Sequence, residues 1–189
     1  MTQSPTLIVG LGNPGAQYAA TRHNAGVVVV DALAAQYGAS FGAQSQCHAH
    51  TARVRTPTHN LILAKPTIFM NDSGRSVRAL CDYYDIPAAR VILVHDESDL
   101  PLGTYRIQTG RGAAGHNGVA SVIAALGTKD FTRVRVGVRP ERPEDAPRAA
   151  AMAFVLKEFA PAERALFADV VKDVTAAIDA MVTATVRET

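Results

Sequence analysis

Cysteine is scarce in this chain, and its two residues, Cys47 and Cys81, lie in no metal-binding motif. Free thiols in a reducing cytoplasm are the simplest interpretation, because small secreted domains that depend on disulfides carry more cysteines. A chain of 189 residues also needs no such cross-link, since a domain of this size buries about 70% of its unfolded surface. We therefore expect a cytoplasmic protein.

Long hydrophobic runs are also absent. No apolar stretch approaches the roughly 20 residues that a membrane-spanning helix requires. The N-terminal stretch MTQSPTLIVG has no basic residue before its apolar part, so it does not resemble a signal peptide. We expect no membrane association. The net charge of +2 and the pI near 8.7 allow a polyanionic partner without requiring one.

Strand-like and helix-like segments alternate along the chain. Apolar runs and alternation predict strands at 6–11, 51–56, 60–66, 90–96, 103–109 and 131–138. Helical spacing of apolar residues predicts helices at 26–38, 71–87, 116–127 and 161–182, and a charged, proline-rich loop is expected at 139–150. This order predicts an α/β fold, a single globular domain over 1–189 with a mixed, largely parallel central sheet flanked by helices.

The glycine-rich turn LIVGLGNPG allows two interpretations. Gly10, Gly12 and Gly15 match the G-x-G-x-x-G pattern of a dinucleotide-binding loop. An acid, Asp31, follows at a plausible distance. In that motif, however, the acid ends a second strand, whereas Asp31 lies inside the helical pattern of 26–38. The pattern therefore disfavours a nicotinamide or flavin cofactor.

Polar side chains follow several of the predicted strands. Asn13, Asn71 and Asn117 come after three of them, and Asp96 ends the apolar run VILVHD. His23 lies in the loop before the first predicted helix. Ligands of open parallel sheets bind at the carboxyl ends of the strands, so we expect these side chains to share a cleft. Each of the Asn and Asp residues could also serve only as a helix cap or turn former.

This set of side chains favours water activation over covalent catalysis. The chain has no G-x-S-x-G motif and no cysteine that opens a helix, so an obvious nucleophile is missing. A histidine held by a carboxylate can activate water directly, and asparagine amides can donate to a developing oxyanion. Such a site suits esters, because an alkoxide leaves more easily than an amine. Cys47, His48 and His50 could suggest a metal, but further ligands are not apparent.

Four motifs resemble the bacterial peptidyl-tRNA hydrolases in order and spacing. They are LIVGLGNPGAQYAATRHNAG at 7–26, KPTIFMNDSG at 65–74, VHDESDLPLGTYRI at 94–107 and GHNG at 115–118. NPG followed by TRHN is typical of this family, which accounts for the glycine-rich turn without a cofactor. The resemblance implies a monomeric cytoplasmic enzyme without cofactor or metal. It would hydrolyse the ester of peptidyl-tRNA released from the ribosome.

The same resemblance implies roles for individual residues. His23 would activate water, Asp96 would orient the His23 imidazole, and Asn13 would help select N-blocked substrates. The expected substrate contacts are Tyr18, Phe69, Met70, Asn71, His116 and Asn117. Contacts to tRNA phosphates are expected from Arg106, Arg111, Arg133 and Arg135, although each could be a solvated surface residue.

Two other classes compete with this interpretation. An RNA-binding protein could use the same fold without catalysis, but it could lose His23 or Asp96 without penalty, and both are present. A nucleotide-dependent oxidoreductase would need a strand-ending acid at the position where the sequence predicts a helix. The ester hydrolase is therefore the favoured interpretation.

Overall fold

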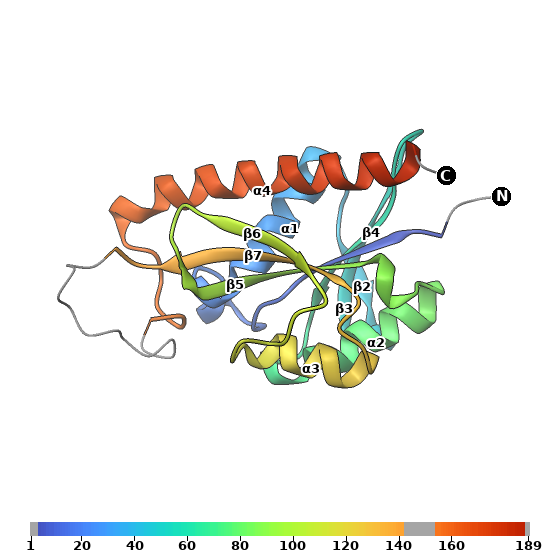
Figure 1. The fold of residues 1–189 in the computed structure, drawn as a ribbon, viewed down its shortest axis with the longest axis horizontal. Helices are drawn as coiled ribbons and strands as arrows, with labels where there is room; N and C mark the ends of the chain where they lie inside the picture. The colour runs from blue at the N-terminus through green and yellow to red at the C-terminus, as the bar shows by residue number, and fades with distance from the viewer. Residues whose placement is uncertain (1–3, 142–153, 188–189) are drawn as a thin grey trace.

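The computed structural model describes residues 4–141 and 154–187, and these form one seven-stranded sheet (Figure 1). The strand order across the sheet is β2-β3-β4-β1-β5-β7-β6. The strands are β1 (Thr6–Gly10), β2 (Gly42–Gln44), β3 (Ala49–Arg55), β4 (Asn60–Pro66), β5 (Val91–Pro101), β6 (Tyr105–Thr109) and β7 (Thr132–Arg139).

The centre of the sheet is parallel and its edges are antiparallel. β4, β1, β5 and β7 pair in parallel, so their carboxyl ends meet along one edge of the molecule. β3 runs antiparallel to β4, β2 to β3, and β6 to β7. The predicted mixed, largely parallel sheet is therefore confirmed, and it places the ends of β1 and β5 side by side.

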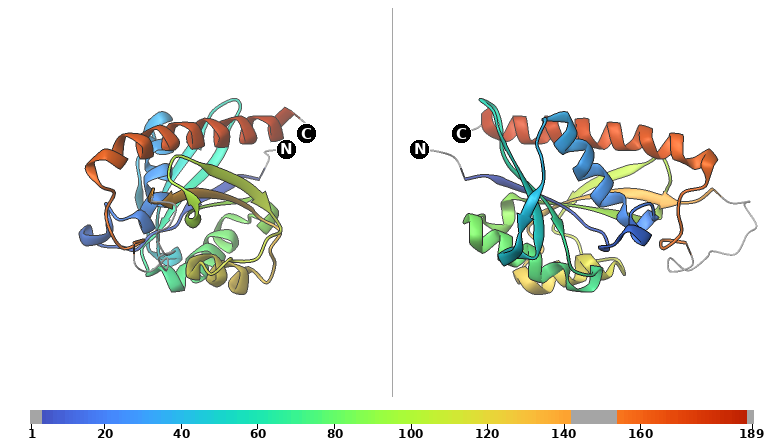
Figure 2. Two further views of the ribbon diagram at one scale, coloured as in Figure 1. Left: turned by 60° about the vertical axis from the view of Figure 1, so that its left-hand side comes forward. Right: turned by 180° about the vertical axis from the view of Figure 1, so that it is seen from behind.

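Helices cover both faces of the sheet (Figures 1 and 2). They are α1 (Ala25–Gln36), α2 (Ser73–Tyr84), α3 (Asn117–Leu126) and α4 (Pro161–Arg187). α1 and α4 pack on one face and α2 and α3 on the other, which divides the buried apolar residues into two clusters. Burial on both faces explains why the central strands are continuous apolar runs. Within the described ranges, no helix is both long and apolar enough to cross a membrane.

Two departures from the predicted elements have local causes. β2 was not predicted, because it has only three residues and its burial is slight. β5 continues past the predicted end at residue 96 to Pro101, with a register irregularity against β7 between Glu97 and Pro101. The loop expected at 139–150 lies almost entirely outside the described residues.

Glycines in the first motif allow α1 to lie directly on the strands. A Cβ atom at Gly26 would lie 2.2 Å from the carbonyl oxygen of Val94, and one at Gly10 would lie 2.3 Å from the oxygen of Gly26. Asp31 lies within α1 and binds Lys65 Nζ over 2.6 Å. The glycines thus serve close helix–strand packing, and the strand-ending acid of a dinucleotide site is absent from this position.

Candidate active site

Three predicted site residues meet at the carboxyl edge of the parallel strands. His23 lies in the short 3-10 helix η2 (Arg22–Asn24), Asp96 lies in β5, and His116 directly precedes α3. His23 Nδ1 and His116 Nε2 each lie 2.9 Å from the same oxygen, Asp96 Oδ1. Residues separated by 73 and 20 positions from Asp96 therefore form one hydrogen-bonded group.

Asp96 is a buried carboxylate that remains ionised. Asp96 is only 2% exposed. Burial by itself would raise the pKa of this carboxyl, but the electrostatic interaction and hydrogen bond with His116, followed by those with His23, outweigh burial and hold the Asp96 pKa well below its ordinary value. An ionised carboxylate can only accept hydrogen bonds, so Nδ1 of His23 carries the proton. Nε2 is then the basic nitrogen of the His23 ring.

His116 has both ring nitrogens engaged. Its Nδ1 accepts the backbone N–H of Val119 over 3.3 Å, which caps the first turn of α3. Nε2 must then carry the proton that is donated to Asp96. His116 was expected among the substrate contacts, and the structure adds a hydrogen bond that holds Asp96 from the side of α3.

His95 lies beneath this group and was not identified from sequence. Its Nδ1 donates to the backbone carbonyl of Asp96 over 2.7 Å, and its ring meets that of His116 edge-on with centroids 4.7 Å apart. Burial, followed by the electrostatic interaction with the neighbouring His116 ring, holds the pKa of His95 well below its ordinary value. His95 is therefore a neutral support under the carboxylate. A histidine inside an otherwise apolar strand was the signal that could have revealed it.

Asn13 is fixed by two neighbouring segments. Its Oδ1 accepts the N–H of Met70 over 2.9 Å, at the start of the 3-10 helix η4 (Met70–Asp72). The backbone N–H of Asn13 donates to Asn24 Oδ1 over 2.9 Å, and Asn24 Nδ2 donates to the Asn13 carbonyl over 3.0 Å. The bond from Met70 fixes Oδ1, and the Nδ2 group of Asn13 can donate to a substrate. Asn24, the residue after His23, is buried and holds the backbone of Asn13.

An aromatic pair lies near Asn13. The rings of Tyr18 and Phe69 meet edge-on, with centroids 6.3 Å apart and planes at 87°. Phe69 is 53% exposed, which is unusual for a phenylalanine and leaves its face open to a ligand. Both residues were predicted to contact substrate, and the structure brings them together.

Close packing brings the two remaining asparagines toward one region. Met70 is buried, and a Cβ atom at Gly118 would lie 2.4 Å from its sulfur, so η4 packs directly on the first turn of α3. Asn71 follows Met70 and Asn117 precedes Gly118, and both are exposed. Their amides are available to a ligand on the same side of the sheet as His116.

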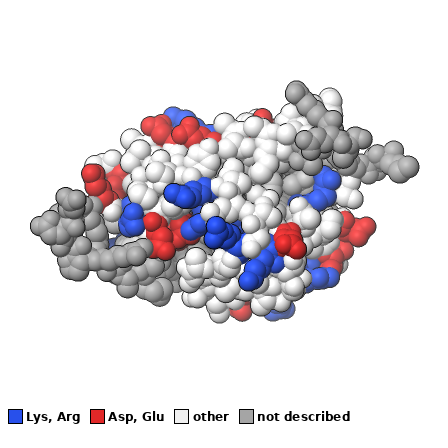
Figure 3. Space-filling view, viewed as in Figure 1, with Lys and Arg blue, Asp and Glu red and all other residues white. Residues whose placement is uncertain are grey.

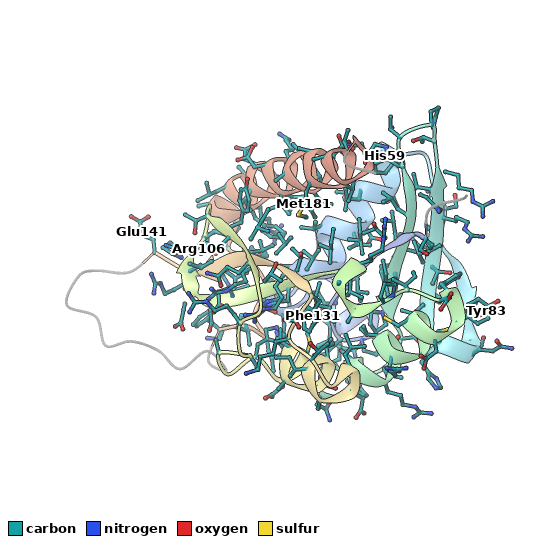
Figure 4. All side chains as sticks on the ribbon, turned by 45° about the vertical axis from the view of Figure 1, so that its right-hand side comes forward. His59, Tyr83, Arg106, Phe131, Glu141 and Met181 are labelled. Atoms are coloured by element: carbon teal, nitrogen blue, oxygen red, sulfur yellow. The ribbon has the colours of Figure 1, made fainter. Side chains whose placement is uncertain are left out.

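The arginines expected to bind phosphates have different environments. Arg106 and Arg111 are exposed, and Figure 4 shows Arg106 at the edge of the sheet on β6. Arg135 is held by Glu97 Oε2 over 2.8 Å and by Gln108 Oε1 over 2.7 Å. Figure 3 shows a band of Lys and Arg side chains across the face on which β6 lies, with acidic side chains beside it.

Arg133 does not have the surface position that was expected of it. It is only 2% exposed, and its Nη1 is buried without a hydrogen-bond partner among the described atoms. Burial lowers the pKa of its guanidinium, as do the charges of Arg135 and Arg111. The alternation of 131–138 suggested a solvated face for its arginines, but β7 lies between β5 and β6, and Arg133 is buried there. We therefore remove Arg133 from the surface contacts.

The donor atoms of His23, Asp96 and His116 lie within 4.8 Å of one another, a composition that can hold a metal ion. A cation there would have to replace both N–H donors on Asp96 Oδ1. The second set of possible metal ligands, Cys47, His48 and His50, does not point to one place. Cys47 is buried and its Sγ donates to the carbonyl of Ala79, whereas His50 is exposed on β3.

Fold and site together define an α/β hydrolytic enzyme in which a histidine–carboxylate group lies at the carboxyl edge of the sheet. The chain belongs to the peptidyl-tRNA hydrolase family, whose model matches residues 7–189.

Relatives and solved structures agree with this membership. A peptidyl-tRNA hydrolase of Mycobacterium tuberculosis is 51% identical over 162 residues, covering 85% of this chain and 82% of the relative. One from Mycobacterium marinum is 48% identical over 161 residues, with the same coverage of both chains. The crystal structure of peptidyl-tRNA hydrolase from Acinetobacter baumannii superposes with a TM-score of 0.86 at 31% identity, covering 100% of this chain and 93% of that one.

Proposed function

We propose that this protein hydrolyses the ester bond of peptidyl-tRNA released from the ribosome, and that His23 activates the attacking water. The observation that supports this role is the hydrogen bond from His23 Nδ1 to the buried carboxylate of Asp96. It holds the imidazole in the tautomer whose Nε2 can accept a proton, and the carboxylate stabilises the imidazolium that forms.

The reaction follows from this arrangement. Nε2 of His23 takes a proton from water as the water oxygen attacks the ester carbonyl, and a tetrahedral oxyanion forms. The exposed amides of Asn71 and Asn117 are the donors that we assign to this oxyanion and to the peptide. The imidazolium then returns its proton to the departing ribose oxygen. The products are a free peptide carboxylate and tRNA.

Substrate selection and binding use the surrounding side chains. The Asn13 amide would donate to the carbonyl of the blocked amino end, because its own oxygen is already engaged by Met70. Tyr18 and Phe69 would contact the substrate beside it. Arg106 and Arg111 would contact tRNA phosphates. We propose further that residues 1–189 act as one domain, as a monomer and in the cytoplasm.

A hydrolysis assay with N-acetylaminoacyl-tRNA tests the proposal. The parent protein should release the N-acetylamino acid, with kcat/KM rising with pH through one histidine ionisation and then levelling off. His23→Ala should lower kcat about 10²–10⁴-fold, the usual effect of losing a general base, while still binding tRNA. The matched control is His50→Ala, an exposed histidine on β3 that should leave the rate unchanged.

Each possible failure has a separate meaning. If the parent protein bound tRNA without hydrolysing the ester, the non-catalytic alternative would replace the proposed activity. If the parent were active and a folded His23→Ala protein worked at close to the same rate, the activity would stand and the role of His23 would be wrong.

A further inference from the structure

Arg22 directly precedes His23, but its side chain is buried and bonds to other residues than Asp96. The residue is 5% exposed. Its Nη2 donates to Glu163 Oε2 over 2.5 Å and its Nη1 donates to the carbonyl oxygen of Val138 over 3.1 Å. The guanidinium carbon also lies 4.7 Å from the centroid of the Phe159 ring. A fully charged group is thus held from three directions behind the histidine.

The backbone on both sides of His23 is bound to the same region. The N–H of Arg22 donates to the carbonyl of Lys157 over 3.0 Å, and the N–H of His23 itself donates to that of Val155 over 2.8 Å. Thr21 forms an antiparallel bridge with Glu158. The segment before α4 therefore supports η2 like a short additional strand, and the position of His23 depends on where this segment lies.

Glu163 connects Arg22 to the start of α4. Its Oε2 also accepts the N–H of Ala160 over 2.7 Å, and its own N–H donates to the carbonyl of Ala160 over 2.9 Å. Phe159, beneath the guanidinium, stacks on Phe167 of α4 with centroids 4.1 Å apart. One carboxylate oxygen thus joins the first turn of α4 to the residue beside the histidine, across 141 positions of sequence.

We infer that Arg22 and Glu163 are positioning residues for His23, and that the ion pair between buried Arg22 and partly exposed Glu163 sets the alignment of the imidazole with Asp96. Arginine suits this place because its planar guanidinium donates to a carboxylate and to a carbonyl at once. A displacement of a catalytic group by about 1 Å can lower the rate about 10²-fold. A residue that anchors the base can therefore affect turnover without touching substrate. The inference rests on the proposed role of His23 as the base.

Glu163→Gln tests the ion pair with little change of shape. We expect kcat to fall about tenfold or more, with KM within about twofold of the parent value, because the substrate-contacting residues are unchanged. In ¹⁵N NMR, the protonated Nδ1 signal of His23 should weaken as the hydrogen bond to Asp96 becomes heterogeneous. The matched control is Glu158→Gln in the same segment, whose carboxylate is 60% exposed and lies 3.6 Å from Arg164 Nη2. It should match the parent in both measurements.

A double variant separates positioning from stability, since Glu163→Gln leaves a buried charge without its partner. Arg22→Met combined with Glu163→Leu removes both charges, and such replacements commonly retain a stable fold. We expect thermal stability near that of the parent with kcat still reduced.

Recovery of kcat together with stability in the double variant would overturn the inference, as would a Glu163→Gln enzyme with the parent kcat and the parent His23 spectrum. The His23→Ala assay distinguishes this failure from that of the proposed function. An inactive His23→Ala protein beside a fully active Glu163→Gln protein would reject only the positioning role.

Discussion

His23 and His116 share one hydrogen-bond acceptor, with His23 Nδ1 and His116 Nε2 each 2.9 Å from Asp96 Oδ1. Their ring centroids lie 5.2 Å apart. Because the second nitrogen of His116 is engaged by the cap of α3, that ring holds the carboxylate in place while His23 keeps a free basic nitrogen. The two histidines are therefore not interchangeable, although they contact the same oxygen.

Two substitutions of His116 should separate its hydrogen bond to Asp96 from its role as the N-cap of α3. His116→Ala removes a hydrogen bond to a charged group, worth about 1.5–3 kcal/mol, so we expect kcat to fall about 10–100-fold with a smaller change in KM. His116→Asn is the control, because asparagine caps helices well. It should recover thermal stability and leave kcat low. A rise in KM with kcat unchanged would instead make His116 a substrate contact only.

The low pKa of Asp96 makes stability depend on pH. Above the pKa of an unfolded aspartate, about 3.9, the folded carboxylate contributes its full stabilisation, and this contribution is lost as pH falls through the depressed folded value. The Asp96→Asn variant lacks this contribution. In urea unfolding, the free energy of unfolding of the parent should exceed that of the variant most at pH 6–7, and this difference should shrink below about pH 4. A gap that stayed constant from pH 3 to pH 7 would contradict the assignment.

Asn13→Ala should weaken substrate selection. Loss of its amide donors leaves a substrate carbonyl unpaired, which costs about 1–3 kcal/mol for the N-acetylated substrate. The preference for N-acetylaminoacyl-tRNA over free aminoacyl-tRNA should narrow by about 5–100-fold, as measured by the ratio of the two kcat/KM values. Equal losses for both substrates would make Asn13 a structural residue that only holds η4.

Salt dependence tests the arginines. Arg106→Ala and Arg111→Ala should each raise KM more than they lower kcat, and should flatten the log–log dependence of tRNA affinity on salt by about 0.7–0.9 per lost contact. Arg133→Met should leave this slope unchanged, because the side chain is buried. Arg164→Ala, an exposed arginine on α4, is a second control. If neither Arg106 nor Arg111 changed the slope, this edge of the sheet would not bind tRNA.

The fold followed closely from local patterns. The spacing of Val30, Leu33 and Ala34 distinguished a helix from a strand despite four consecutive valines, and α1 has that form. Gly127 ends α3 in a left-handed conformation, as expected of a glycine after a helical pattern. Short β2 escaped prediction because an exposed strand carries no hydrophobic signal.

The sequence by itself determined most of the strands and all four helices, and that Asn13 follows the first strand, because side chains a few residues apart obey the periodicity of the backbone. Only the tertiary structure decided that Arg133 is buried, since a period of two shows which residues share a face but not whether that face is exposed to solvent. The same holds for Arg22 and Glu163, which lie 141 positions apart and meet only when α4 packs beside the loop that carries His23.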